Sequence, residues 1–87
     1  MMKVQIMYYG RPSSSLMVTS EKLEIPGDFS MLGNVLNRLR ERGYRWVYEL
    51  DESHLICTVN DEIAAASDTI KERDEIAIFS RKSWLDA

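Results

Sequence analysis

Hydrophobic and polar positions alternate near both ends of the chain. In residues 3–9 every second side chain is apolar and would enter a core: Val4, Ile6 and Tyr8. Residues 75–80 repeat this alternation, with Ile76 and Ile78 on the inward face. A period of two over such lengths is typical of half-buried β-strands. Both segments are therefore predicted to be strands with one face in the core.

Turn-forming residues follow the first strand. The run Gly10–Ser15, with one Pro and three Ser, is predicted to be a loop. The next run, Leu16–Ile25, is predicted to be a second strand, which Pro26 and Gly27 would end. Two strands joined by a short polar loop predict a hairpin.

The apolar spacing then changes to that of a helix. Four apolar residues recur at i, i+3, i+4 and i+7: Leu32, Val35, Leu36 and Leu39. This spacing places them on one helical face. Asp28 or Ser30 is predicted to cap this helix, and Gly43 lies where helices commonly stop in a left-handed conformation. Residues 44–52 are predicted to be an extended or turn segment over the edge of the core.

The remaining elements complete a two-layer arrangement. Residues 55–60 are predicted to be a strand, residues 63–66 a short segment of undefined type, and residues 71–74 a polar turn before the last strand. A hairpin followed by a helix buries that helix against one face of a mixed sheet. The predicted fold class is therefore α+β, a ubiquitin-like β-grasp with one main helix, with the domain over residues 1–80 and a tail over residues 81–87.

Composition and charge exclude several classes of protein. With 45% hydrophobic and 29% charged residues in 87, the chain is too apolar for disorder and too interrupted by charge for a membrane span. A net charge of −3 makes nucleic acid an unlikely main partner. The single Cys allows no internal disulfide. No secretory signal opens the chain, so we expect a cytoplasmic protein.

No catalytic, cofactor or metal site is predicted. His54 is the only histidine, and no spacing around it supplies further ligands or a nucleophile. Cys57 alternates with Leu55 and Val59 and is expected to enter the core. The adjacent acidic pairs at residues 61–62 and 74–75 are interpreted as solvated turns, with Asp74 bonding local backbone amides.

Four basic residues lie near the end of the predicted helix: Arg38, Arg40, Arg42 and Arg45. Cations there complement the helix dipole and aid solubility, which is the interpretation we favour. An acidic partner or RNA is the alternative for these arginines. The negative net charge gives the RNA alternative little support.

Three sequence segments resemble the MoaD and ThiS family of ubiquitin-like sulfur carriers. They are the opening Met2-Lys3-Val4-Gln5-Ile6, the pair Val59-Asn60 followed by Ile63, and the acidic turn into the last strand, Asp74-Glu75-Ile76-Ala77-Ile78-Phe79. The resemblance covers nearly the whole chain and implies a β-grasp fold. It also implies a non-enzymatic protein that binds an activating enzyme or a synthase subunit.

The tail departs from the family pattern. Carriers of this family end in Gly-Gly, whose carboxylate is adenylated and converted to a thiocarboxylate. Glycine suits this role because a chain without Cβ atoms can thread a narrow channel. Here the last glycine is Gly43, and the sequence after Phe79 contains none. We therefore expect this chain to lack thiocarboxylate chemistry.

The outward face of the sheet is the predicted binding site. If the apolar set of the first and last strands faces the helix, Met7 and Phe79 point to the uncovered face. Apolar residues there indicate a contact surface. In the family this face docks on the protein partner, and Met7, Ile63 and Phe79 occupy the matching positions. Trp84 in the tail is added because tryptophan is enriched at binding hot spots.

The sequence thus predicts a small partner-binding subunit in or near molybdopterin synthesis and sulfur transfer. The alternative is a ubiquitin-like adaptor with no sulfur role, recruited for its sheet surface. Neither role requires a cofactor or a membrane.

Overall fold

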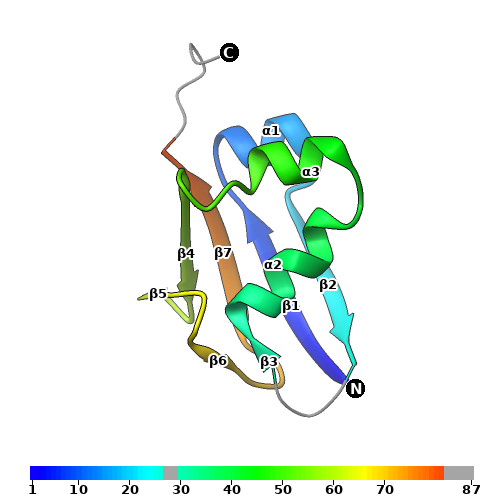
Figure 1. The fold of residues 1–87 in the computed structure, drawn as a ribbon. Helices are drawn as coiled ribbons and strands as arrows, with labels where there is room; N and C mark the ends of the chain where they lie inside the picture. Colours follow the sequence, from blue (N-terminus) through cyan, green and yellow to red (C-terminus); the bar gives the residue numbers. More distant parts are fainter. Residues whose placement is uncertain (27–29, 82–87) are drawn as a thin grey trace.

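The computed structural model describes residues 1–26 and 30–81. Within these residues the main sheet has five strands in the order β2-β1-β7-β4-β5. The strands of this sheet are β1 (Met2–Tyr8), β2 (Ser20–Ile25), β4 (Leu55–Val59), β5 (Glu62–Ala64) and β7 (Glu75–Ser80). The short strands β3 (Ser30–Met31) and β6 (Thr69–Ile70) form a separate antiparallel pair. Figure 1 shows where the helices lie against the main sheet: α1 (Arg11–Leu16), α2 (Leu32–Arg40) and α3 (Tyr44–Glu49).

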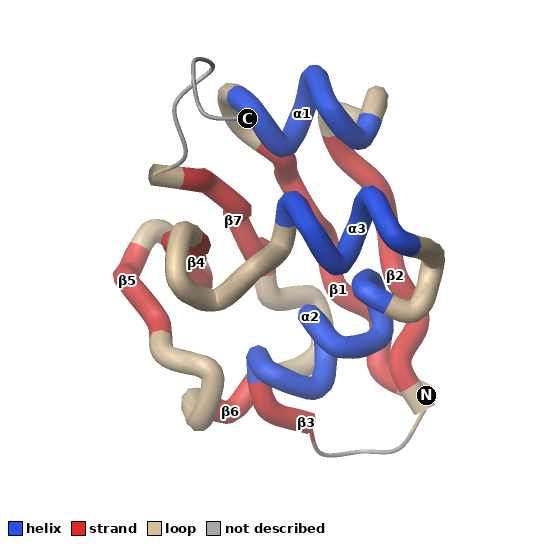
Figure 2. Tube along the Cα trace, turned by 45° about the horizontal axis from the view of Figure 1, so that its top comes forward, coloured by secondary structure: helices blue, strands red, loops and turns tan. Residues whose placement is uncertain are grey.

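The two strands predicted from alternation lie side by side at the centre of the sheet. β1 and β7 are parallel, with Ile6 opposite Ile76 and Tyr8 opposite Ile78. β2 and β4 flank them in antiparallel pairs. The inward side chains form one core with the apolar face of α2. Figure 2 shows this helix lying against the sheet. The mixed sheet with a helix on one face confirms the α+β, ubiquitin-like β-grasp prediction.

The main helix is α2 (Leu32–Arg40), and its apolar face is buried as the spacing predicts. Its cap differs from the prediction. Met31 is the N-cap, and its N–H donates to Oδ1 of Asn34 at 2.9 Å. Ser30 instead pairs with Ile70 in the small sheet, whereas Asp28 lies outside the described residues. The predicted cap at Ser30 is therefore wrong, because strand pairing occupies that residue.

The helix also ends earlier than predicted. Glu41 is the C-cap of α2 in a right-handed conformation. Gly43 has φ 148° and immediately precedes the next helix. The N–H of Gly43 donates to the carbonyl of Arg40 at 3.3 Å, which closes the turn between the two helices. The positive φ predicted at Gly43 is thus present, but it starts a helix rather than ending one.

The predicted loop Gly10–Ser15 is wrong in part. Residues Arg11–Leu16 form a short helix, α1, with Pro12 buried near its start. Pro suits the first turn of a helix because its missing N–H has no partner there in any case. The strand predicted from Leu16 therefore begins only at Ser20, although its antiparallel pairing with β1 is as expected.

The segment Tyr44–Glu52, predicted to be an extended or turn segment, contains a third helix. α3 spans Tyr44–Glu49 and lies in the same layer as α1 and α2 (Figure 2). Tertiary contacts explain the difference. Trp46 packs edge-on against Tyr8, with ring centroids 6.0 Å apart. The Glu49 carboxylate, only 4% exposed, accepts from Nε of Arg11 at 3.1 Å and from the Ser15 hydroxyl at 2.7 Å. These bonds join α3 to α1.

Candidate protein-binding surface

Strand register brings a row of side chains together on the uncovered face of the main sheet. Met7 lies opposite Ala77, Ala77 opposite Thr58, and Thr58 opposite Ile63. Residues directly opposite each other in a sheet share a face. Phe79 and Ile56 form a neighbouring pair on the same face. We call the apolar members, together with Tyr9, the outer sheet surface: Met7, Tyr9, Ile56, Ile63, Ala77 and Phe79.

Three of the four predicted site residues lie on this surface. Ile63 is 84% exposed and Phe79 is 36% exposed, whereas Met7 is half-buried. Ile6 and Ile78, the inward neighbours of Met7 and Phe79, are fully buried. The outward orientation predicted for Met7 and Phe79 therefore agrees with the structure, and their role in binding stays a prediction. Trp84 lies outside the described residues.

Tyr9 is a surface residue that the sequence reasoning placed outward but did not assign to the site. Its ring stacks on that of Phe79, with centroids 4.9 Å apart and planes 10° from parallel. Its hydroxyl lies 3.6 Å from the sulfur of Met7. The alternation already placed Tyr9 on the same face as Met7, so the signal was present in the sequence.

Charged and polar side chains occupy the other end of the same sheet face. Register places five of them there: Lys3, Gln5, Lys22, Glu24 and Glu75. Lys3 and Glu24 form an exposed ion pair at 3.6 Å. The uncovered face is therefore divided along the strands into an apolar half and a charged half.

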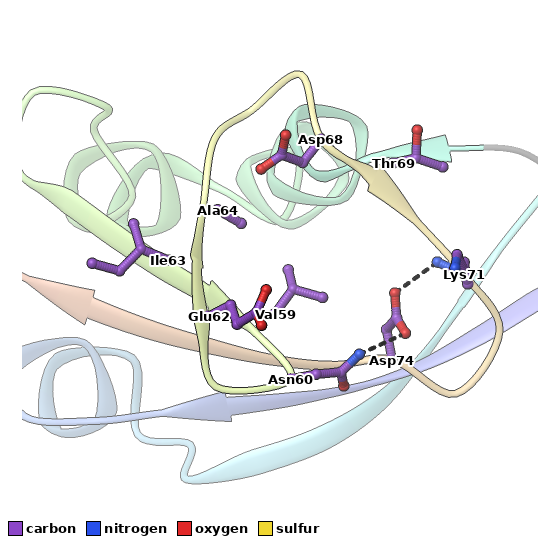
Figure 3. A pocket seen from close by; sticks show the side chains of 9 residues that line it. All are labelled: Val59, Asn60, Glu62, Ile63, Ala64, Asp68, Thr69, Lys71 and Asp74. Atoms are coloured by element: carbon purple, nitrogen blue, oxygen red, sulfur yellow. Dashed lines mark hydrogen bonds between the residues drawn. The ribbon is translucent and has the colours of Figure 1, made fainter.

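A pocket of about 360 Å³ lies beside Ile63, between the β4–β5 turn and the loop before β7 (Figure 3). Asp74 organises one wall of this pocket. Its Oδ1 accepts from the side-chain amide of Asn60 at 3.0 Å, and its Oδ2 accepts from the N–H of Lys71 at 2.8 Å. The interpretation of Asp74 as a residue that bonds local backbone amides is confirmed. Its role in the pocket is structural.

The structure places Cys57 in the core, as its alternation with Leu55 and Val59 predicts. Cys57 is buried in the core, and burial raises the pKa of its thiol to about 11, against a smaller opposing effect of Arg40. At neutral pH the thiol is therefore protonated and a poor nucleophile. His54 bonds through its backbone, to Asp51 and Arg81. In residues 1–26 and 30–81, no three His, Cys, Asp or Glu side chains converge as metal ligands would.

The arginines near the end of α2 are largely engaged within the domain. Arg42 forms a bidentate pair with Glu21 at 2.6 and 2.7 Å. This pair, with the Tyr8 hydroxyl donating to the same carboxylate, holds the pKa of Glu21 below its usual range. Arg40 donates to the Leu50 carbonyl, and Arg45 donates to that of Ser15. Arg40, Arg42 and Arg45 thus bind different neighbours within the domain.

None of the helices in the described part of the chain has the length and apolar character needed to cross a bilayer. The five-stranded mixed sheet with its helices in one layer defines the class of the fold, a ubiquitin-like β-grasp.

Comparison with known proteins places the chain within this class. The sequence pattern of the ThiS family matches residues 6–80, which is most of the 87-residue chain. The chain therefore belongs to the ThiS family, and its resemblance to MoaD- and ThiS-type ubiquitin-like sulfur carriers is confirmed. Among curated proteins, none has significant sequence similarity to this chain.

Three solved structures share the fold. A protein assigned as subunit 1 of molybdopterin converting factor from Pyrococcus furiosus has a TM-score of 0.79 at 20% identity, covering 92% of this chain and 98% of its own. SAMP1 from Haloferax volcanii has a TM-score of 0.75 at 17% identity, with coverages of 93% and 97%. The H. volcanii HVO 2177 protein has a TM-score of 0.78 at 15% identity, with coverages of 95% and 86%.

Proposed function

We propose that this protein is a non-enzymatic, ubiquitin-like subunit of a sulfur-transfer system, in or near molybdopterin synthesis. It acts by docking onto a protein partner, either an activating enzyme or a synthase subunit. Membership of the ThiS family and the name of the P. furiosus neighbour support the choice of system. The docking site is the outer sheet surface around Met7, Ile63 and Phe79, with Trp84 as a further contact from the tail.

The observation that supports this proposal is the apolar half of a sheet face that none of the described helices, α1 to α3, covers (Figure 2). Phe79 and Ile63 remain exposed there, although Ile78, the inward neighbour of Phe79, is fully buried. Exposed apolar patches commonly mark sites of protein association. The charged half of the same face borders this apolar half. Interfaces between proteins commonly combine an apolar core with a polar rim.

Replacing Phe79 by Asp is expected to abolish this docking. A carboxylate at the centre of an apolar contact would lose its water on binding without gaining a partner. We expect the affinity for a ThiS-type activating enzyme from the same organism, measured by isothermal titration calorimetry, to fall by at least ~30-fold, as for a hot-spot residue. Val47→Asp, at a 51% exposed apolar position on α3, serves as the matched control. Equal affinities for both variants and the unmodified protein would contradict the proposed surface.

A second candidate function is an adaptor with no sulfur role, which uses the same surface. Its support is the outer sheet surface, whose exposed Ile63 and Phe79 would serve an adaptor as well as a subunit of a sulfur-transfer system. Fold alone does not determine chemistry, so family membership is compatible with either role.

A thiocarboxylate carrier would differ from both of these roles in the mass of the polypeptide after activation. With activating enzyme, ATP and a sulfur donor, the 87-residue chain is expected to keep its mass, because side chains near its end hinder entry into a narrow adenylation channel. In a variant, Gly-Gly replaces Trp84-Leu85 and ends the chain. The activating enzyme is expected to adenylate the terminal carboxylate of this variant, which releases pyrophosphate from ATP. Mass spectrometry showing sulfur in place of one oxygen on the unmodified chain would contradict this prediction and establish the carrier role.

A further inference from the structure

We propose that Tyr9 is an anchor residue of the outer sheet surface, where it holds Phe79 and Met7 in the arrangement that the partner binds. The partner meets this trio with an uncharged, apolar side chain. This inference rests on the proposed function, because it concerns the same docking event. It adds a specificity-determining residue and the chemistry of the partner's contact.

The backbone of Tyr9 is fixed on both sides. Its N–H donates to the carbonyl of Ile78 at 3.0 Å, which extends the parallel pairing of β1 and β7 by one residue. The next residue, Gly10, has φ 63° and ψ −133°, a conformation open essentially to glycine alone. The chain therefore turns sharply into α1 directly after Tyr9, and the Tyr9 side chain stays on the sheet face beside Phe79.

The side chain of Tyr9 contacts both Phe79 and Met7. The stacking on Phe79 and the contact of its hydroxyl with the Met7 sulfur connect neighbouring strands on the uncovered face. Yet Tyr9 is 44% exposed, so much of it remains available to a partner. Aromatic pairs in this offset geometry are favourable beyond the area that they bury. The trio is thus ordered before binding.

The fixed arrangement of Met7, Tyr9 and Phe79 and their lack of charge together indicate which kind of side chain the partner places on them. Tyr is among the residues most enriched at hot spots, and rigid groups lose little conformational entropy on binding. Met7, Tyr9 and Phe79 carry no formal charge at neutral pH, and the charged residues of this sheet face lie in its other half. A charged side chain placed on the trio would be desolvated without a counter-ion, so an apolar one is favoured.

The test measures affinity of the full 87-residue chain for a ThiS-type activating enzyme. Tyr9→Ala is expected to weaken binding by ~10–30-fold, with the same loss at low and high salt because the contact is uncharged. Tyr9→Phe keeps the stacking but loses the hydroxyl contact with the Met7 sulfur, so its affinity is expected to lie between those of Tyr9→Ala and the unmodified protein. Tyr44→Ala removes a tyrosine that is 87% exposed on α3, and this control should bind normally.

A double-mutant cycle separates anchoring from simple contact. If Tyr9 and Phe79 act as a pair, Tyr9→Ala combined with Phe79→Ala loses less affinity than the product of the single losses. Urea unfolding of each variant, followed by circular dichroism, should give midpoints close to that of the unmodified protein.

Each other outcome overturns a definite statement. Normal binding by Tyr9→Ala, with loss of binding by Phe79→Asp, overturns the role of Tyr9 and leaves the proposed function intact. A loss that shrinks at high salt overturns the apolar contact. Normal binding by both variants overturns the docking role of the outer sheet surface and this inference together. No binding by the unmodified protein overturns docking on an activating enzyme, and this inference with it.

Discussion

Replacing Glu49 by Ala is expected to lower the free energy of unfolding by ~3–5 kcal/mol, because it breaks a buried ion pair from one side. The Glu49 side chain is 4% exposed and that of Arg11 is 12% exposed. Removing the carboxylate leaves the guanidinium in a largely dehydrated place and takes the acceptor from the Ser15 hydroxyl. The free energy of unfolding of a small domain is ~5–15 kcal/mol, so this loss is a large part of the total.

Urea unfolding followed by far-UV circular dichroism measures the effect of Glu49→Ala. Glu52→Ala is the control, since Glu52 is exposed and we expect a change within ~0.5 kcal/mol there. Glu49→Gln keeps the size and one acceptor oxygen, and should fall between the two. A loss for Glu49→Ala no larger than that for Glu52→Ala would show that the ion pair contributes little to holding α1 against α3.

Adjacent residues of β7 are expected to respond in opposite ways to the same substitution. Ile78 is fully buried between β1 and β4, so Ile78→Asp places a carboxylate in the core at a cost of several kcal/mol and should unfold the domain. Phe79→Asp loses mainly the stacking on Tyr9, for which we expect at most ~1.5 kcal/mol.

Circular dichroism and urea titration of these two variants check the orientation of the strand independently of any partner. Folded Ile78→Asp protein with near-normal stability would contradict the inward placement of that residue. Unfolding of Phe79→Asp as severe as that of Ile78→Asp would show that the outer sheet surface is part of the core.

The elements that were predicted correctly are those whose side-chain period is imposed by the sheet or by the main helix. Alternation in β1 and β7 and the i, i+3, i+4 spacing of α2 each follow from one apolar face. α1 and α3 were not predicted, because each is only six residues long and is stabilised by distant partners. The Tyr, Trp and Val of α3 favour strands by propensity. The bonds of Glu49 and the packing of Trp46 on Tyr8 override that preference.

The sequence predicts which face of the sheet carries the candidate surface, but only some of the residues that belong to it. Alternation alone placed Met7, Tyr9 and Phe79 outward, but Ile63 was assigned only through the family resemblance. No local pattern indicates that β5 pairs with β4 and brings Ile63 into the row with Thr58. Likewise, the stacking of Tyr9 on Phe79 depends on parallel pairing between segments about seventy residues apart.

That parallel pairing has a consequence for how the chain folds during synthesis. β7 is the last strand to be made, yet it lies between β1 and β4. A nascent chain released only to residue 74 can form the β1–β2 and β4–β5 pairs, but isolated two-stranded hairpins are marginally stable in water. The apolar edges of both pairs stay open until β7 arrives and joins them. Contacts of such high sequence separation slow folding, so the central strand pair completes late and the ribosome-bound chain is the state most exposed to aggregation.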